Sequence, residues 1–407
     1  MSWTWSEDDL AVKQAVRDFV DKQIRPRHDD LEHGDLPPYD VVREFYAAFG
    51  IADAAAEKFD WDIAAAEAKE RGEEPPTEDP GGLDPAMSAI ANIELVKVVP
   101  GIPTAIGVSV GLAAGTINSL GTTEQRKRWA RDLLTFEKVG AWAITEPDAG
   151  SNAFGAMRTT VKPDGDEFIL NGQKTFITNG PYADTMVVYA KLDDGSGVDR
   201  RDQPVLPFVL DKGMEGLTQG NPFHKMGNHS SPTGELFFEN IRLGRDRLLA
   251  GKPGSDGRES AKANFVAERV GMATFSLGII EECQRLSIDY AKTRMLYGKP
   301  IGELQLIQLK LAEMEIARVN VENMVLKGLA ARRAGTVMDL AEASAIKLYA
   351  TRAANDVAME AVQLFGGNGY MAEYRVEQLA RDSKALMIYA GSNEVQVTHV
   401  AKGLLRR

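Results

Sequence analysis

Glu268 has a sequence context that favours acid–base chemistry. Phe265, Glu268, Met272, Phe275 and Ile279 follow one another at intervals of three and four residues, so they share one helical face that is otherwise apolar. A carboxylate on such a face loses water, and its pKa rises towards neutrality. The spacing therefore predicts a general base, whereas a helical glutamate without this context is ordinarily a solvated charge.

A second group of residues has the chemistry to bind a large phosphorylated ligand. Arg294 carries a planar guanidinium that can bind phosphate oxygens in pairs. Gly366 and Gly367 open a glycine-rich turn, where backbone can approach a diphosphate closely. Taken alone, such a turn is an ordinary helix C-terminus. Thr145 and Thr178 likewise suit an ordinary β-strand.

Three segments must position these side chains. Residues 1–139 have a largely helical apolar period, with an insertion near 53–85 in which we expect a short helix at 64–70 and then a mobile surface loop at 70–82. Residues 140–250 alternate with period two and contain Asn-Gly turns, one of them at 171–173. Residues 251–407 return to the helical period. The prediction is an α+β fold with an N-terminal helical domain, a middle β-barrel-like domain and a C-terminal four-helix bundle.

Composition excludes several classes of function. The chain has 407 residues and a net charge of −12, which argues against a nucleic-acid partner. One cysteine, Cys283, allows no intrachain disulfide and fits a reducing compartment, and the five histidines have no zinc spacing, so we expect no metal. The first ten residues lack the pattern of a signal peptide. Lys97, Pro100 and Pro103 interrupt the most apolar run. We therefore expect a cytoplasmic protein with no membrane span.

Five motifs together carry a family resemblance. They are AITEPDAGSN (143–152), NGQKTFITNG (171–180), RMLYGKPIGELQ (294–305), QLFGGNGY (363–370) and IYAGSNEVQ (388–396). In this order and spacing the chain resembles the acyl-CoA dehydrogenases, flavoproteins that insert a double bond between Cα and Cβ of an acyl-CoA thioester. The resemblance covers nearly the whole chain outside the insertion near 53–85.

The resemblance implies FAD as cofactor and assigns contacts to individual residues. Near the flavin ring and the substrate it places Thr145, Ser151, Phe176, Thr178, Ser392 and Glu394. At the diphosphate and adenosine it places Arg294, Tyr297, Gln305, Gln363, Gly366 and Gly367. In the family, residues of the latter motifs reach the cofactor from a neighbouring subunit. The resemblance therefore implies a homo-oligomer, either a tetramer or a dimer.

The catalytic base of most family members is a carboxylate directly before the loop glycine, and here that position is Ala390. A minority, resembling isovaleryl-CoA and long-chain dehydrogenases, carries Ala or Gly there and a Glu on a bundle helix, which matches Glu268. The resemblance also places Arg269, Tyr389, Ala390 and Gly391 at the substrate, with the Ala390 N–H available to the thioester oxygen.

The implied reaction is FAD-dependent α,β-dehydrogenation of an acyl-CoA to the trans-2-enoyl-CoA. Glu268 would abstract the α-proton and flavin N5 would take the β-hydride, with an electron-transfer flavoprotein as the electron acceptor. Many members have an acidic residue that contacts the CoA arm at the position of Val266. Whether the thioester carrier is free CoA therefore stays an open question. Two alternatives also stay open: a flavin-dependent oxidase or monooxygenase on the same fold, and a catalytically silent flavin-binding subunit, which Ala390 favours and Glu268 opposes.

Overall fold

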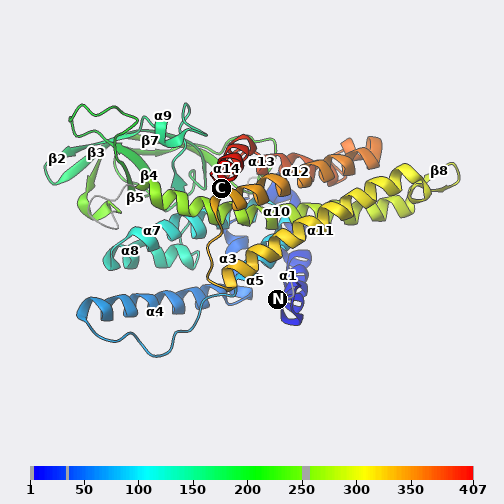
Figure 1. Ribbon diagram of the computed structural model, residues 1–407, viewed down its shortest axis with the longest axis horizontal. Helices are drawn as coiled ribbons and strands as arrows, with labels where there is room; N and C mark the ends of the chain where they lie inside the picture. The colour runs from blue at the N-terminus through cyan, green and yellow to red at the C-terminus, as the bar shows by residue number, and fades with distance from the viewer. Residues whose placement is uncertain (1–3, 34–35, 250–256, 407) are drawn as a thin grey trace.

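The computed structural model describes residues 4–33, 36–249 and 257–406, and it has helical first and last parts around a mixed β-sheet (Figure 1). The helices of the first part are α1 (Glu7–Phe19), α2 (His28–Glu32), α3 (Tyr39–Ala48), α4 (Ile51–Arg71), α5 (Pro85–Val96), α6 (Gly101–Ile106), α7 (Gly115–Leu120) and α8 (Thr123–Leu134). Two π-helical stretches, Val20–Ile24 and Gly107–Ala114, continue α1 and join α6 to α7.

Local sequence signals set several helix starts. Ser6 and Asp9 form a reciprocal capping box at the start of α1, as their spacing predicts. Thr122 and Gln125 form the equivalent box at α8. Both boxes satisfy backbone N–H groups that a helix start otherwise leaves unpaired.

The short helix predicted at 64–70 is part of a longer one. Residues 51–71 form α4, which is three times as long as the prediction. Phe59 and Ile63 are buried one turn apart in a cluster that includes Trp129 of α8, and the alanine-rich sequence between them favours a helix. Gly72, at φ +74°, ends it with a C-terminal cap. Only the following residues, up to Asp84, form the exposed irregular segment that the Pro/Gly-rich sequence predicted.

The middle part is a seven-stranded mixed sheet. Its strands are β1 (Gly140–Ala143), β2 (Thr160–Asp164), β3 (Glu167–Thr178), β4 (Thr185–Leu192), β5 (Val205–Asp211), β6 (Leu217–Gln219) and β7 (Thr233–Gly244), with the short helix α9 (Ala153–Ala156) after β1. The order is β1-β4-β2-β3-β7-β6, with β5 paired to the other edge of β4. β4 is buried on both faces because Val187 and Tyr189 pack towards α7 and α8, while Met186 and Val188 pack inside the curved sheet.

The Asn-Gly sequence at 171–173 is not a turn between two strands. β3 passes straight through it as one strand of twelve residues paired with β7. The register shifts between Leu170 and Gly172, which marks a β-bulge. Gly172 has φ +146°, and a Cβ there would lie 2.5 Å from Thr159 Oγ1. The glycine is therefore required by close packing inside the sheet and not by chain reversal.

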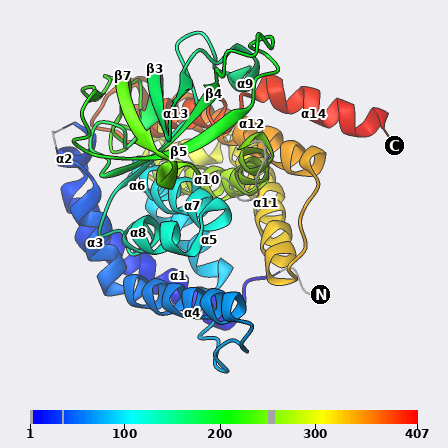
Figure 2. The ribbon, with the colours of Figure 1, turned by 90° about the vertical axis from the view of Figure 1, so that its left-hand side faces the viewer.

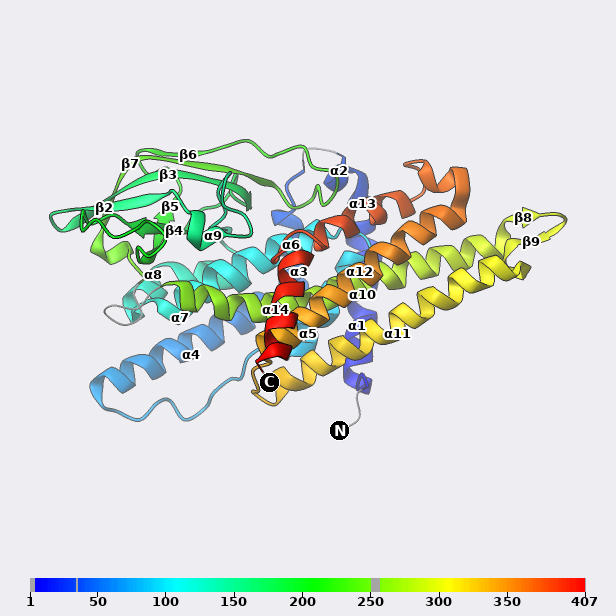
Figure 3. The ribbon, with the colours of Figure 1, turned by 45° about the horizontal axis from the view of Figure 1, so that its top comes forward.

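The last part is a bundle built on α10 (Gly257–Thr293), α11 (Gln305–Arg333) and α12 (Leu340–Phe365), completed by α13 (Val376–Leu386) and α14 (Asn393–Leu405). Met272, Phe275 and Ile279 of α10 are buried, as their spacing predicts, and Cys283 is a buried free thiol. The sheet lies at one end of the molecule and the hairpin β8 (Met295–Leu296) and β9 (Lys299–Pro300) at the other (Figure 3). α14 projects from the body (Figure 2).

One helical stretch, Gly101–Leu120, is long and apolar enough to cross a membrane by length and composition. In this fold 56% of its most apolar window is buried. Ala105, Ala113 and Ile117 are fully enclosed there. The stretch therefore packs as an internal helix of the chain, the arrangement expected from its interruption by proline.

Candidate functional site

A cavity of about 2190 Å³ lies where the three parts of the chain meet. Drug-sized ligands occupy pockets of roughly 300–1,000 Å³, so this cavity has room for a large cofactor together with a substrate. Residues from the first helical part, the sheet and the bundle all line it, among them Tyr46, Thr178 and Glu268. Ten residues predicted for the site lie on its wall: Thr145, Ser151, Phe176, Thr178, Glu268, Arg269, Tyr389, Ala390, Gly391 and Ser392.

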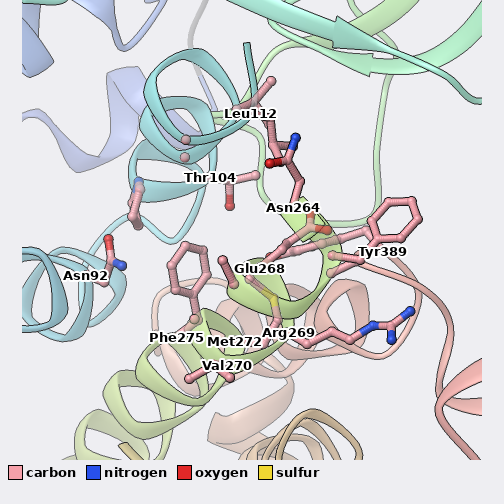
Figure 4. A pocket seen from close by; sticks show the side chains of 18 of the residues that line it. Asn92, Thr104, Leu112, Asn264, Glu268, Arg269, Val270, Met272, Phe275 and Tyr389 are labelled. Atoms are coloured by element: carbon pink, nitrogen blue, oxygen red, sulfur yellow. The ribbon is translucent and has the colours of Figure 1, made fainter. Parts of the chain in front are cut away.

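Glu268 faces this cavity from α10, among the side chains drawn in Figure 4. Phe265, Met272 and Phe275 of the same helix line the cavity beside it. Burial raises the pKa of Glu268 to about 7, although the positive charges of Arg269 and Lys347 oppose the rise. The carboxyl group is therefore poised to change protonation state near neutral pH.

The loop that precedes α14 brings Ala390 and Gly391 into the cavity in left-handed backbone conformations, with φ of +56° and +79°. Such a φ is strained for alanine. No acceptor in the described part of the chain bonds the Ala390 N–H. Gln396 Nε2 donates to the Gly391 carbonyl at 2.7 Å. The loop thus holds a free backbone donor, the feature needed to stabilise negative charge on a thioester oxygen.

Arg269 is buried beside this loop. Its Nη1 donates to Ser344 Oγ at 3.2 Å, and its Nε has no hydrogen-bond partner among the described residues. Its Nη2 lies 3.5 Å from the point where a Cβ on Gly391 would stand. This placement brings the guanidinium close to the loop and leaves donor capacity for a ligand.

Thr145, Ser151, Phe176 and Thr178 lie on the β-domain side of the cavity. The loop that carries the first two is anchored by Glu146, whose buried carboxylate accepts from Lys174 Nζ at 2.8 Å and from the Thr159 N–H at 3.0 Å. Phe176 sits at a bulge of β3 with φ +56° and is 67% exposed.

An exposed aromatic ring at the mouth of a cavity, flanked by threonine hydroxyls, can cover and hydrogen-bond a flat heterocycle. The residues present therefore fit an isoalloxazine ring. Glu394, by contrast, is exposed on the first turn of α14 and does not line the cavity.

The remaining predicted cofactor residues gather at the far end of the bundle. Arg294, Tyr297, Gln305, Gln363, Gly366 and Gly367 are all exposed, and none lines the cavity. Tyr290 joins the two motifs because its ring stacks on Phe365 with centroids 4.0 Å apart and its hydroxyl accepts from Asn368 Nδ2 at 3.0 Å. We call these six residues the distal group.

Several cavity residues were not predicted from the sequence. Asn92 and Thr104, on α5 and α6, line the cavity opposite Glu268 (Figure 4). Lys347 is fully buried on α12 next to the Ala390 loop. A sequence signal for it exists, because Lys347 interrupts a stripe of small buried residues that includes Ala343, Ala350 and Ala354. In the described residues, no group of three or more His, Cys, Asp or Glu side chains could hold a metal ion.

Comparison with protein families matches the chain along nearly its whole length. The acyl-CoA dehydrogenase N-terminal domain matches residues 6–137, the middle domain residues 141–241 and the C-terminal domain residues 255–405. The three matches follow the order of the helical part, the sheet and the bundle.

Individual relatives align end to end. A short-chain specific acyl-CoA dehydrogenase of Megasphaera elsdenii is 34% identical over 395 residues, covering 96% of both chains. A caffeyl-CoA reductase–Etf complex subunit of Acetobacterium woodii is 30% identical over 414 residues, covering 99% of this chain and all of the relative. The solved structure of butyryl-CoA dehydrogenase from Megasphaera elsdenii superposes with a TM-score of 0.83 at 30% identity and covers both chains completely.

Proposed function

Because this chain belongs to the acyl-CoA dehydrogenase family of FAD-dependent oxidoreductases, we propose that Glu268 is its catalytic base. In acyl-CoA dehydrogenation the α-proton of the thioester leaves to a base. Bound FAD supplies the acceptor for the hydride that leaves the β-carbon. The observation that carries the assignment is the position of Glu268, a carboxylate on the cavity wall with its pKa raised to about 7.

The loop before α14 has a different task in this proposal. Ala390 has no side chain that could take a proton, but it lies in a left-handed turn on the cavity wall, and no acceptor among the described residues bonds its N–H. As the α-proton leaves, negative charge grows on the thioester oxygen, and a fixed backbone donor stabilises it. The base and the oxyanion donor therefore come from two elements, α10 and the loop, and Arg269 lies beside both.

We also propose that the functional unit is a homo-oligomer. Arg294 follows Glu268 by 26 residues and stands directly after the last residue of α10, which is roughly 39 Å from Glu268 at 1.5 Å per residue. One cofactor that contacts Thr145 and Thr178 would have to span that length to reach the distal group of its own chain. A neighbouring subunit that offers its distal group removes this difficulty, and it would also cover the exposed Tyr297 ring.

An electron-transfer flavoprotein is the proposed electron acceptor, since two electrons must leave after each turnover. A relative that is a subunit of an Etf complex supports this pairing. The cytoplasmic location expected from the sequence stays a prediction.

The decisive experiment is anaerobic titration of the purified yellow protein with a panel of acyl-CoAs while flavin absorbance is followed. Wild type should bleach with at least one acyl-CoA, and Glu268→Gln should bleach about 10²–10⁴ times more slowly because the amide cannot accept the proton. Glu281→Gln is the matched control, since Glu281 is also a carboxylate of α10 but pairs with Lys13 and Lys97 away from the cavity.

Equal bleaching rates in wild type and Glu268→Gln would refute the assignment. Rapid oxygen consumption with substrate, in place of stable bleaching, would point to an oxidase on the same fold.

A further inference from the structure

Lys347 is a buried cation that the reaction as described does not use. Its side chain has no exposed surface. Its Nζ donates to the Gly391 carbonyl at 2.9 Å and to Asn393 Oδ1 at 3.0 Å. No carboxylate lies within 4.0 Å of this ammonium group among the residues that the structure describes. A buried charge whose direct partners are neutral is costly.

The charges around Lys347 show what could compensate it. Glu268 of α10 and Glu394 of α14 attract its charge through space, whereas Arg269 repels it. Of the two carboxylates, Glu394 is exposed and screened by water, whereas Glu268 is enclosed. The main electrostatic partner of the buried lysine is therefore the proposed catalytic base.

We propose that Lys347 is a positioning residue for proton abstraction, which braces the Ala390–Gly391 turn from behind and holds Glu268 in its carboxylate form. The proposal rests on Glu268 being the base. It assigns one side chain of α12 to both parts of the site, because the same ammonium group donates to the Gly391 carbonyl and its charge acts on Glu268 through space.

The contacts explain how the turn is held. Two consecutive residues with positive φ persist only when their surroundings fix them. Lys347 and Gln396 both donate to the Gly391 carbonyl, and Thr351 Oγ1 donates to Asn393 Oδ1 at 3.1 Å. A neutral apolar residue at 347 would remove one of the two donors and leave Asn393 Oδ1 with a single partner. The Ala390 N–H would then be less firmly oriented.

The charges around Glu268 determine the direction in which its pKa would change without Lys347. Burial lowers the pKa of Lys347 to about 8, and Glu268 opposes that fall. Burial raises the pKa of Glu268 to about 7, and Arg269 and Lys347 oppose that rise. His399, whose own pKa burial lowers, faces Arg269 from α14. With a neutral residue at 347, only Arg269 would favour the carboxylate, so the pKa of Glu268 would move further upward.

The test compares Lys347→Met with wild type in two measurements. The first is the pH dependence of kcat/KM, whose acidic limb should move upward by about one unit when the buried positive charge is removed. The second is hydrogen exchange of the backbone amides in residues 388–396, which should become faster without the brace. Lys347→Arg keeps the charge, so it should retain the acidic limb even where its larger head group perturbs the loop.

Lys191→Met is the matched control, since Lys191 is also fully buried and donates to two backbone carbonyls, those of Gly155 and Arg200, but bonds neither Gly391 nor Asn393. It should leave both measurements at wild-type values. A wild-type acidic limb and wild-type exchange in Lys347→Met would overturn the proposal. Should Lys347→Met fail to fold, an acidic limb moved upward in Lys347→Gln supports the proposal and an unmoved limb rejects it. Bleaching that survives in Glu268→Gln would instead reject the base assignment itself.

Discussion

Near its start α10 carries Glu268 on the wall of the cavity, whereas Arg294, 26 residues later and directly after the end of α10, is exposed beside an aromatic ring that is 87% exposed. The first region has its polar groups fixed by neighbours within the chain, as Lys347 and Gln396 fix the Gly391 carbonyl. In the second, the polar and aromatic groups of the distal group are exposed, and none of them lines the cavity. This contrast is the basis of the proposal that a neighbouring subunit completes the distal end of the bundle.

The largest expected effect in this comparison is the pH dependence of kcat/KM, which depends on Glu268. Glu268 must be a carboxylate to accept a proton, and its pKa is raised to about 7. The rate constant kcat/KM should therefore fall as pH falls below 7, by about tenfold per unit and roughly 100-fold by pH 5. Stopped-flow bleaching between pH 5 and 8 measures it. A profile that stays flat down to pH 5 would mean that the essential base has an ordinary carboxylate pKa.

A substitution at the exposed end should affect the cofactor and not the proton transfer. Arg294→Ala would remove charged hydrogen bonds to a phosphate, each worth about 1.5–3 kcal/mol, so FAD should dissociate about 10–150 times more readily. Fluorescence of released flavin on dilution measures this. Arg285→Ala is the control, because Arg285 lies on α10 shortly before Arg294 and pairs with Glu282 and Asp289.

Mixed oligomers test whether Glu268 and Arg294 of one site come from different chains. Glu268→Gln and Arg294→Ala chains can be co-expressed. A shared site is then intact when the Arg294→Ala chain supplies Glu268 and the Glu268→Gln chain supplies Arg294. If sites are shared in symmetric pairs, about a quarter of the wild-type sites should return. No recovery of activity in verified mixed oligomers would show that the distal group serves its own chain or no cofactor at all.

The smallest expected effect concerns the strained backbone of Ala390 on the cavity wall. Ala390 has φ +56°, and a left-handed conformation costs an alanine roughly 1–2 kcal/mol that glycine does not lose. Ala390→Gly should therefore change the free energy of unfolding by less than about 1 kcal/mol in either direction, because the greater freedom of glycine in the unfolded chain offsets the relief. Ala390→Val should destabilise the protein clearly. Chemical denaturation of the two variants decides between these outcomes.

Helix starts and the base-bearing face could be predicted because they depend on residues close in sequence. The capping boxes at Ser6 and Thr122, and the apolar spacing around Glu268, are of this kind. The Asn-Gly sequence in β3 misled because a bulge and a hairpin turn use the same residue types, and only pairing with β7 distinguishes them. The helix predicted at 64–70 was too short, because the burial of Phe59 and Ile63 of α4 in a cluster with Trp129 is a tertiary contact that the local sequence does not reveal.

The family resemblance, and not periodicity, located most of the candidate site residues. The resemblance did not identify Lys347. Its proposed role depends on a contact between residues 44 positions apart, in which its ammonium group donates to the Gly391 carbonyl. The shape of the cavity was not predicted for a similar reason, since side chains from all three parts of the chain form its wall. Such tertiary arrangements leave no local pattern in a single sequence.

A ligand that fills a space walled by Tyr46, Thr178 and Glu268 contacts three parts of the chain at once. Its binding free energy therefore adds to the thermal stability of each of them, by an amount that grows with the logarithm of ligand concentration. Retained yellow colour would then report completed folding as well as cofactor content. Destabilising changes as remote as α4 or the sheet edge would appear first as pale protein.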